Sequence, residues 1–407
     1  MSRFSFPRRR FLQGASAIAA WGAVPGMQVM RAAHAASGAP ATLIVIHLAG
    51  GNDTLNTVIP YKDPNYYSIR GQLAVPAAQV LPLNDRQGLH PSLSGIKQLY
   101  DAHKVAIVNG VGYPRFDYSH FDAMQIYWTG DPVGAAPNGW LGNALDQIAA
   151  GAAPDPMTGT AIGLLGARSL TASSLTAPVL PSKPQQYVLP VKDAAQRDAL
   201  SRILQQPLTG SNLLRDAFVN NSRSALQAYN TVQSAEDLTT PIAYPGNDLA
   251  QGLKFAAQLL RTDSDIRVIT LAQGAYDTHE NQYALHAQRL AELSAAIKVF
   301  LDDLQAQAIS HRAVILVWSE FGRRIRPNAS GGTDHGSAQA MFLIGDSVRG
   351  GIVGEAPKLT APDIIDGGNL KMQYDFRQVY ATVLSGWLGV SARSVLGADW
   401  GALPLLL

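Results

Sequence analysis

The chain has 407 residues, a formal net charge of +2 and no cysteine. The lack of cysteine excludes disulfide bonds, thiolate metal ligands and a cysteine nucleophile. Hydrophobic residues make up 47% of the chain, and a chain of this length can bury a large core. We therefore expect one large α/β domain with an insertion, rather than two equal domains.

Residues 1–35 are predicted to be an export leader. They include the run Pro7-Arg8-Arg9-Arg10-Phe11-Leu12-Gln13, which resembles the twin-arginine signal, a weakly apolar stretch over 11–27, and the small-x-small sequence Ala33-His34-Ala35. The apolar stretch is too short to span a bilayer; a basic amphipathic anchor is the alternative. We expect a signal peptide over 1–35, a single domain over 36–407, and a periplasmic or secreted protein exported by the twin-arginine machinery.

The basic character of the chain comes mostly from this leader. It holds five of the 32 basic residues and none of the 30 acidic ones, so its removal changes the formal charge to −3. No basic patch with interleaved aromatic residues remains, so we do not expect nucleic acid as a partner. No later segment approaches the length of a membrane span, so none is expected in the mature chain.

Strand and helix patterns alternate along the mature chain. Apolar runs at 41–49, 104–109, 160–165, 266–272, 313–318 and 340–344 predict strands, and the continuous runs are typical of parallel strands buried on both faces. Helical patterns lie between and after them, at 93–103, 119–128, 139–149, 194–234, 247–261, 280–307 and 375–388. This alternation predicts a mostly parallel central sheet with helices on both faces. Residues 172–190, rich in Ser, Thr and Pro, open a predicted insertion that extends to about 234.

Polar residues follow three of the predicted strands. Gly50-Gly51-Asn52-Asp53 follows the first, Asp277-Thr278-His279 follows 266–272, and Ser319-Glu320-Phe321 follows 313–318. Ligand sites of open α/β sheets gather at the carboxyl ends of the strands. Carboxylates and imidazoles brought together there predict a single metal-assisted active site.

The metal ligands that we expect are Asp53, Asp277, His279, Glu320 and His335. Three ordinary alternatives exist: a turn role for Asp53, a helix cap at Asp277 or Thr278, and a salt bridge from Arg323 or Arg324 to Glu320. His335 lies between glycines and follows Asp334, which could orient its imidazole. Oxygen and nitrogen ligands together suit a divalent metal such as zinc, manganese or iron, and zinc or manganese is the expectation.

The catalytic residues that we expect are Ser119, Asn52 and Arg115. Ser119 begins a predicted helix, where the helix field and a nearby metal favour a nucleophile, although serine is also an ordinary N-cap residue. Asn52 or Arg115 could hold a substrate oxygen, and a solvated loop arginine is the alternative for Arg115. His120 is a weaker candidate for a further ligand or proton donor, and His47 is expected to be a core histidine.

Several other sites are excluded by their absent motifs. The chain has no G-x-S-x-G elbow, no G-x-x-x-x-G-K loop and no H-E-x-x-H helix. Gly110-Val111-Gly112 lacks the third glycine of the dinucleotide fingerprint. These absences argue against elbow-type serine esterases, P-loop enzymes, zincins and nicotinamide dehydrogenases.

The motifs GGND, SHFDA, DTH, SEFGRR, GTDHG and Tyr374-Asp375-Phe376-Arg377, in this order, resemble the domain of unknown function 1501. That family is similar to the alkaline phosphatase and sulfatase superfamily, so the resemblance implies an alkaline-phosphatase-like fold. It also implies Asp53 as the first-strand metal aspartate, Ser119 as the nucleophile, and His335 as the last metal histidine. Asp277 and His279 match an Asp-x-x-x-His pair at shorter spacing, and Phe321 replaces the histidine expected after Glu320. This replacement favours a single metal or a weaker pair.

The sequence therefore predicts an exported metal-dependent hydrolase of phosphate or sulfate esters, acting on a small molecule or a polymer. Ser119 would be its nucleophile, activated by metal. A non-catalytic metal-binding or envelope-assembly protein on the same fold is the main alternative. A carbohydrate-binding module is a weaker one, suggested by Trp128, Trp140, Trp318, Trp387 and Trp400.

Overall fold

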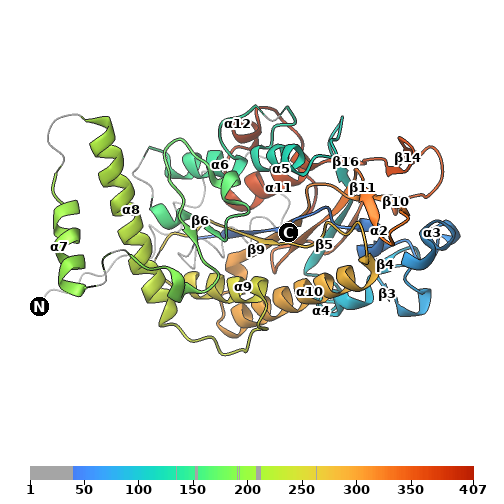
Figure 1. Cartoon of the computed structure of the whole chain (residues 1–407), viewed down its shortest axis with the longest axis horizontal. Coiled ribbons are helices and arrows are strands. Elements are labelled where there is room, and N and C mark those ends of the chain that lie inside the picture. Colours follow the sequence, from blue (N-terminus) through green and yellow to red (C-terminus); the bar gives the residue numbers. More distant parts are fainter. Residues whose placement is uncertain are drawn as a thin grey trace, which may run out of the picture.

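The computed structural model describes residues 40–407, except 134, 152–154, 190, 192, 208–211 and 263. The predicted leader, 1–35, lies outside the described residues. A large sheet runs through the centre of the molecule (Figure 1). Its strands, in spatial order, are β13 (Gly351–Val353), β5 (Val105–Gly112), β12 (Gln339–Ile344), β9 (Ala313–Trp318), β1 (Thr42–Leu48), β8 (Val268–Gln273), β6 (Gly159–Ile162) and β7 (Val179–Leu180), and β16 (Tyr374–Asp375) pairs with β5.

The sheet is mostly parallel, as predicted. β1 lies between β8 and β9 and is parallel to both, and β6 is parallel to β8 and to β7. β12 is the exception, because it is antiparallel to β5 and to β9. The parallel pairing brings the carboxyl ends of β1, β8 and β9 to one edge of the sheet.

Helices cover both faces of the sheet, which confirms the predicted fold class (Figure 1). One face packs against α4 (Ser94–Asp101), α8 (Leu213–Glu236), α9 (Asp248–Leu259) and α10 (Gln282–Ala306). The other packs against α5 (His120–Thr129), α6 (Trp140–Ala149), α11 (Phe376–Val383), the π-helical turn η8 (Leu384–Leu388) and α12 (Ala392–Leu396).

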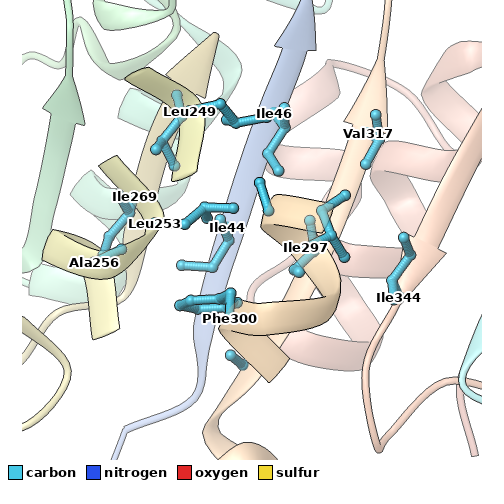
Figure 2. Close-up of a cluster of buried hydrophobic side chains, with 14 of the residues drawn as sticks. Ile44, Ile46, Leu249, Leu253, Ala256, Ile269, Ile297, Phe300, Val317 and Ile344 are labelled. Atoms are coloured by element: carbon cyan, nitrogen blue, oxygen red, sulfur yellow. The ribbon is translucent and has the colours of Figure 1, made fainter. Parts of the chain in front are cut away.

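Alternation along β1 supplies both cores. Ile44 and Ile46 point toward α9 and α10, where they pack near Leu253 and Phe300 (Figure 2), whereas Leu43 and Val45 belong to the opposite core. Successive side chains of a strand point to opposite faces, so a continuous apolar run fits a strand covered on both sides. Each such fully buried side chain contributes roughly 1.5–3 kcal/mol.

The predicted insertion, 172–234, is mainly helical. Helix α7 (Ala194–Leu204) and α8 form a pair that extends beyond one end of the sheet (Figure 1). Only the later part of α8 reaches the core, through Ala228, Val232 and Ala235. Among the residues that the structure describes, no helix combines the length and apolar character needed to cross a bilayer.

Short elements that the sequence did not predict surround the carboxyl edge of the sheet. They include α2 (Thr54–Thr57), α3 (Pro64–Arg70) and a small sheet of β2 (Val58–Ile59), β4 (Gly88–Leu89) and β3 (Leu81–Pro82). Two hairpins join them: β10 (Arg323–Pro327) with β11 (Thr333–His335), and β14 (Ile364–Ile365) with β15 (Asn369–Leu370). A third apolar cluster contains side chains from α2, α3 and both hairpins. These elements therefore pack against one another next to the carboxyl ends of the strands.

Candidate functional site

The loops after β1, β8 and β9 meet around the buried guanidinium of Arg323. Its Nε donates to the Gly51 carbonyl at 2.8 Å, and its Nη1 donates to the Thr333 carbonyl at 2.8 Å. Its Nη2 donates to the Gly50 carbonyl and, at 2.6 Å, to Oδ1 of Asp277. One side chain therefore fixes the loop after β1, the loop after β8 and strand β11 relative to one another.

The two glycines of the GGND motif permit this close approach. Gly50 and Gly51 have φ values of +121° and +78°, a region that L side chains rarely adopt. A Cβ atom on Gly50 would collide with the backbone of Asp277, and one on Gly51 would collide with the ring of Phe321. The motif thus reflects the packing of this loop against its neighbours.

The loop after β8 and strand β11 bring together Asp277, His279 and His335. Nε2 of His279 and Nε2 of His335 are 2.9 Å apart. Oδ1 of Asp277 lies 3.0 Å from the first nitrogen and 3.1 Å from the second. Three of the five predicted metal ligands are therefore in mutual contact.

His120, the first residue of α5, completes the group. Its Nε2 lies 3.4 Å from Oδ2 of Asp277 and has no hydrogen-bond partner within the described part of the chain. Ligand atoms of His120, Asp277 and His335 all lie within 4.8 Å of one another. We call His120, Asp277, His279 and His335 the Asp277 cluster.

Two of the three imidazoles of the cluster have a hydrogen-bond acceptor at Nδ1, the ring nitrogen that points away from Asp277. Nδ1 of His120 lies 2.8 Å from Oε1 of Glu320, and Nδ1 of His335 lies 2.7 Å from the Tyr118 carbonyl. Because these partners only accept, Nδ1 of His120 and of His335 is suited to donate to them, and a neutral ring with its proton on Nδ1 would present a lone pair at Nε2. Nδ1 of His279 lies 3.5 Å from Asp334. Asp334 therefore faces His279, and not His335 as the sequence suggested.

These donors fit a divalent metal ion. Ligands held about 2.1 Å from an ion lie about 3.0 Å apart at right angles and about 3.4 Å apart in a tetrahedron, and the cluster shows both separations. Imidazole lone pairs that are oriented by Nδ1 hydrogen bonds and face a carboxylate are the usual surroundings of zinc. The described residues provide a donor set for one ion here.

Neighbouring charges and burial set the proton affinities of the cluster. Burial alone would raise the pKa of Asp277, but Arg323 and His335 lower it overall. Burial lowers the pKa of His335, against the effect of the Tyr118 carbonyl. The hydrogen bond to Glu320 raises the pKa of His120. Asp277 is therefore ionised at neutral pH, and His335 favours the neutral form that binds metals.

Glu320, predicted as a ligand, lies behind His120. Its Oε1 accepts from the backbone N–H of Gly50 and from His120, each at 2.8 Å. Its Oε2 lies 3.1 Å from Nε2 of His47 and accepts from the Ser319 hydroxyl at 3.1 Å. Burial raises the pKa of Glu320, but the hydrogen bonds from His120 and His47 bring it well below its usual range. Glu320 contacts the Asp277 cluster by its hydrogen bond with His120. Its ionisable partners are His120 and His47, not Arg323 or Arg324.

Asp53 and Asn52 face a second group of polar side chains, away from the Asp277 cluster. Oδ2 of Asp53 accepts from Arg70 and from the Gln282 amide, all three side chains being buried. Oδ1 of Asn52 accepts from Nε2 of His286 at 2.8 Å. We call Asn52, Asp53, Arg70, Gln282 and His286 the Asp53 network. The structure places the predicted ligand Asp53 and the predicted catalytic Asn52 there, engaged with α3 and α10.

Ser119 adjoins the Asp277 cluster through its neighbours. It is the N-cap of α5, and its Oγ accepts from the Asp122 backbone N–H at 3.3 Å. Tyr118 before it accepts from His335, and His120 after it belongs to the cluster. Arg115 is exposed, with a left-handed φ of 59°, on the same loop. The capping role of Ser119 is thus confirmed, and its nucleophilic role stays a prediction.

Sequence reasoning underrated two arginines. The sequence suggests Arg323 only as an alternative partner of Glu320, and Arg70 lies in a short aromatic helix that carries no recognisable signal. The weaker candidate His120 stands out once the strands are assembled, because its SHFDA motif then faces the loop after β8. Three of the five tryptophans proposed for carbohydrate binding, Trp140, Trp318 and Trp387, are buried in the core.

The chain is remotely similar to solved structures of sulfatases and phosphatases. The PsFucS1 sulfatase from Pseudoalteromonas sp. is 12% identical, with a TM-score of 0.41 over 94% of this chain and 75% of that one. A protein in the alkaline phosphatase superfamily from Vibrio parahaemolyticus is 8% identical, with a TM-score of 0.40 over 89% and 70%. The alkaline phosphatase from the Antarctic bacterium TAB5 is 11% identical, with a TM-score of 0.34 over 76% and 92%. At these scores the fold assignment depends on the sheet topology described above.

No curated protein matches the sequence. Residues 105–397 match the family described as "Protein of unknown function (DUF1501)". This match spans well over half of the chain and includes α5, the loop after β8 and strand β11, which carry the Asp277 cluster. The chain therefore belongs to the DUF1501 family.

Proposed function

We propose that the protein is an exported hydrolase of phosphate or sulfate esters that depends on a divalent metal at the Asp277 cluster. The observation that carries the proposal is the convergence of imidazole Nε2 atoms on one carboxylate, with at least two of the rings held by Nδ1 acceptors behind them. His279, His335 and Asp277 would hold the ion, and His120 would approach it from α5. Zinc and manganese suit this mixed set of nitrogen and oxygen donors.

Ser119 is the proposed nucleophile. It lies at the amino end of α5, where the helix dipole stabilises negative charge on its oxygen, and both of its neighbours contact the cluster. A bound divalent cation would supply charge stabilisation for the entering and leaving oxygens. Attack by Oγ forms a bond to phosphorus or sulfur and breaks the bond to the alcohol, which leaves with a proton. Water then cleaves the seryl ester, which releases phosphate or sulfate and restores the hydroxyl.

The second candidate is a non-catalytic metal-binding or envelope-assembly protein. One observation favours it: Phe321 places an apolar ring 4.9 Å from the His120 ring and 4.7 Å from the His335 ring, between centroids. That ring occupies space where a further ligand would extend the site toward a second ion. The hydrolase and a non-catalytic metal-binding protein both require bound metal, so turnover distinguishes them.

The test uses the purified mature protein with Asp277→Asn, His335→Ala and Ser119→Ala. Metal content is measured by mass spectrometry. Hydrolysis is measured with aryl phosphate monoesters, phosphate diesters and sulfate esters as substrates. Asp277→Asn and His335→Ala are expected to lose both metal and turnover, whereas Ser119→Ala keeps the metal and loses turnover. Glu280→Gln, on the same loop as Asp277 and exposed, is the matched control.

The outcomes separate the candidates. Bound metal with no turnover on any ester would favour the non-catalytic function. An absence of bound metal would reject the hydrolase and the metal-binding function, and would leave only the scaffold. Export rests on the leader motif alone, and its test is the location of an Arg8→Lys, Arg9→Lys variant. The variant is expected to stay in the cytoplasm, and its export would remove the twin-arginine assignment.

A further inference from the structure

A mainly apolar pocket of about 350 Å³ lies beside the Asp277 cluster. Its apolar walls come from the loop after β5, from the residue after Glu320 and from the β14–β15 hairpin region. The side chains that give it this character are Tyr113, Phe116, Phe321, Ile365, Leu370 and Met372. The volume falls in the range of ordinary small-molecule sites, about 300–1,000 Å³.

Two features join this pocket to the cluster. Phe321 is a wall of the pocket, and its ring also contacts the rings of His120 and His335. In addition, one short loop lines the pocket with its first residues, 112–116, and then supplies Ser119 and His120. A molecule bound by the cluster therefore has an apolar surface next to it, and the same loop positions both.

The chemistry of the pocket selects its occupant. Its walls offer aromatic and aliphatic surface, which favours an apolar group over a sugar or a polyol. Arg115 and Asp366, both exposed, also line the pocket; their charges oppose each other, so the apolar walls decide the occupant. A cavity of about 150 Å³ holds a benzene ring, so this pocket has room for a larger aromatic or a branched apolar group.

We propose that this pocket binds the apolar, aromatic-sized alcohol part of the ester, so that the protein selects aryl or bulky apolar phosphate or sulfate esters over esters of polar alcohols. This inference rests on the proposed function, since it assigns the group that leaves when Ser119 attacks. It adds a residue-level basis for specificity: Phe321, which is not a metal ligand, becomes the wall shared by the metal and alcohol sites.

The experiment measures binding and turnover separately. Binding of 1-naphthol to the metal-loaded protein is measured by calorimetry, with glycerol as the polar comparison. Turnover is measured as kcat/KM for 1-naphthyl phosphate and for glycerol 2-phosphate, and for 1-naphthyl sulfate if sulfate esters are the substrates. We expect binding of 1-naphthol only, and at least a tenfold preference for the naphthyl ester, since a single methylene contact already gives about tenfold discrimination.

Two variants alter the pocket in different ways. Ile365→Asp places a carboxylate in it, and Met372→Trp fills it; both positions are only partly buried. Each is expected to weaken 1-naphthol binding at least tenfold and to lower the naphthyl preference, with metal content unchanged. Ile203→Asp, on the exposed face of α7, makes the same substitution as the first variant and should change neither quantity.

The results distinguish the pocket from the function. One outcome is that 1-naphthol binds, both pocket variants weaken its binding, and no ester is turned over. This outcome would support an apolar binding site in the pocket and reject the hydrolase. Turnover with equal kcat/KM for the two phosphate esters, and no binding of 1-naphthol, would keep the hydrolase and overturn the pocket proposal. Binding that survives both pocket variants would also overturn it.

Discussion

The Asp277 cluster and the Asp53 network are two carboxylate-centred groups at the same edge of one sheet, and they differ in what surrounds the acid. The Asp53 side chain is 1% exposed and receives hydrogen bonds from Arg70 and Gln282. The Asp277 side chain is 46% exposed and faces three imidazoles. Both acids accept from a buried arginine, Arg70 for Asp53 and Arg323 for Asp277, and Asp277 in addition lies against imidazole nitrogens that can donate electron pairs to a metal.

We propose that the Asp53 network has a structural role and that the Asp277 cluster binds a ligand. A buried carboxylate must be paired, because an unpaired buried charge costs several kcal/mol. The partly exposed carboxylate of Asp277 has water available in addition to its arginine partner, Arg323. Imidazole Nε2 atoms that surround a partly exposed acid therefore contribute little to folding. Binding of a metal ion would account for their arrangement.

The largest effect is expected from Arg70→Met. It leaves the carboxylate of Asp53 buried without its cation, so we expect a loss of about 3–5 kcal/mol in the free energy of unfolding, measured by urea denaturation. The double variant Arg70→Met, Asp53→Asn should recover part of this loss. Zinc bound per folded molecule should stay unchanged. A loss of zinc in the folded single variant would show that the two groups are not separate.

An intermediate effect is expected from Glu320→Gln. The amide can no longer accept from His120 and His47 with both of its polar atoms, so the ring of His120 loses its orientation. Replacing such a partner of a metal-binding histidine typically costs 10–100-fold in metal affinity, and we expect this range for zinc by competition with a chelating dye. Glu280→Gln is the control of identical chemistry. Unchanged affinity in Glu320→Gln would exclude His120 from the metal site.

The smallest effect is expected from pH acting on His286. Burial lowers the pKa of this histidine to about 3, while the unfolded chain has the usual value of about 6.5. Between these values the unfolded state binds the extra proton, so stability is fully present above pH 6.5 and falls as the pH drops. At pH 5.5 the loss from His286 is about 1.4 kcal/mol.

The difference between wild type and His286→Gln isolates this contribution. Urea unfolding at pH 7.5 and pH 5.5 should show a smaller pH-dependent loss in His286→Gln than in the wild type. His103→Asn, which replaces an exposed histidine with φ of 59°, should behave as the wild type. An equal loss in His286→Gln and wild type would mean that this imidazole is not kept neutral by the fold.

Much of the fold could be predicted from local pattern. The run 313–318 coincides with β9, and the helix expected over 139–149 is α6 within one residue at its start. Burial on both faces leaves a strong mark on the sequence, because it removes polar residues from whole segments. The direction of β12 left no such mark, since antiparallel and parallel central strands are equally apolar.

The membership of the site was less predictable than its location. The sequence placed Asp53, Asp277, His279, Glu320 and His335 at one edge of the sheet, and the strand order puts them there. It could not tell which of these carboxylates lies among histidines, because Arg70 reaches Asp53 from α3 and His120 reaches Asp277 from α5. Those partners depend on how separate elements pack, and no local pattern encodes that.

Local sequence pattern specifies the alternation of strands and helices, the two apolar faces of the sheet and the polar ends of β1, β8 and β9, because each follows from the character of neighbouring residues. The folded arrangement is needed to show that Asp53 pairs with Arg70, that Glu320 contacts His120, and that Phe321 lies between the histidines and an apolar pocket. His120 and Glu320, for example, are 200 positions apart in the chain. Such contacts form only where the packing of the core brings the loops together.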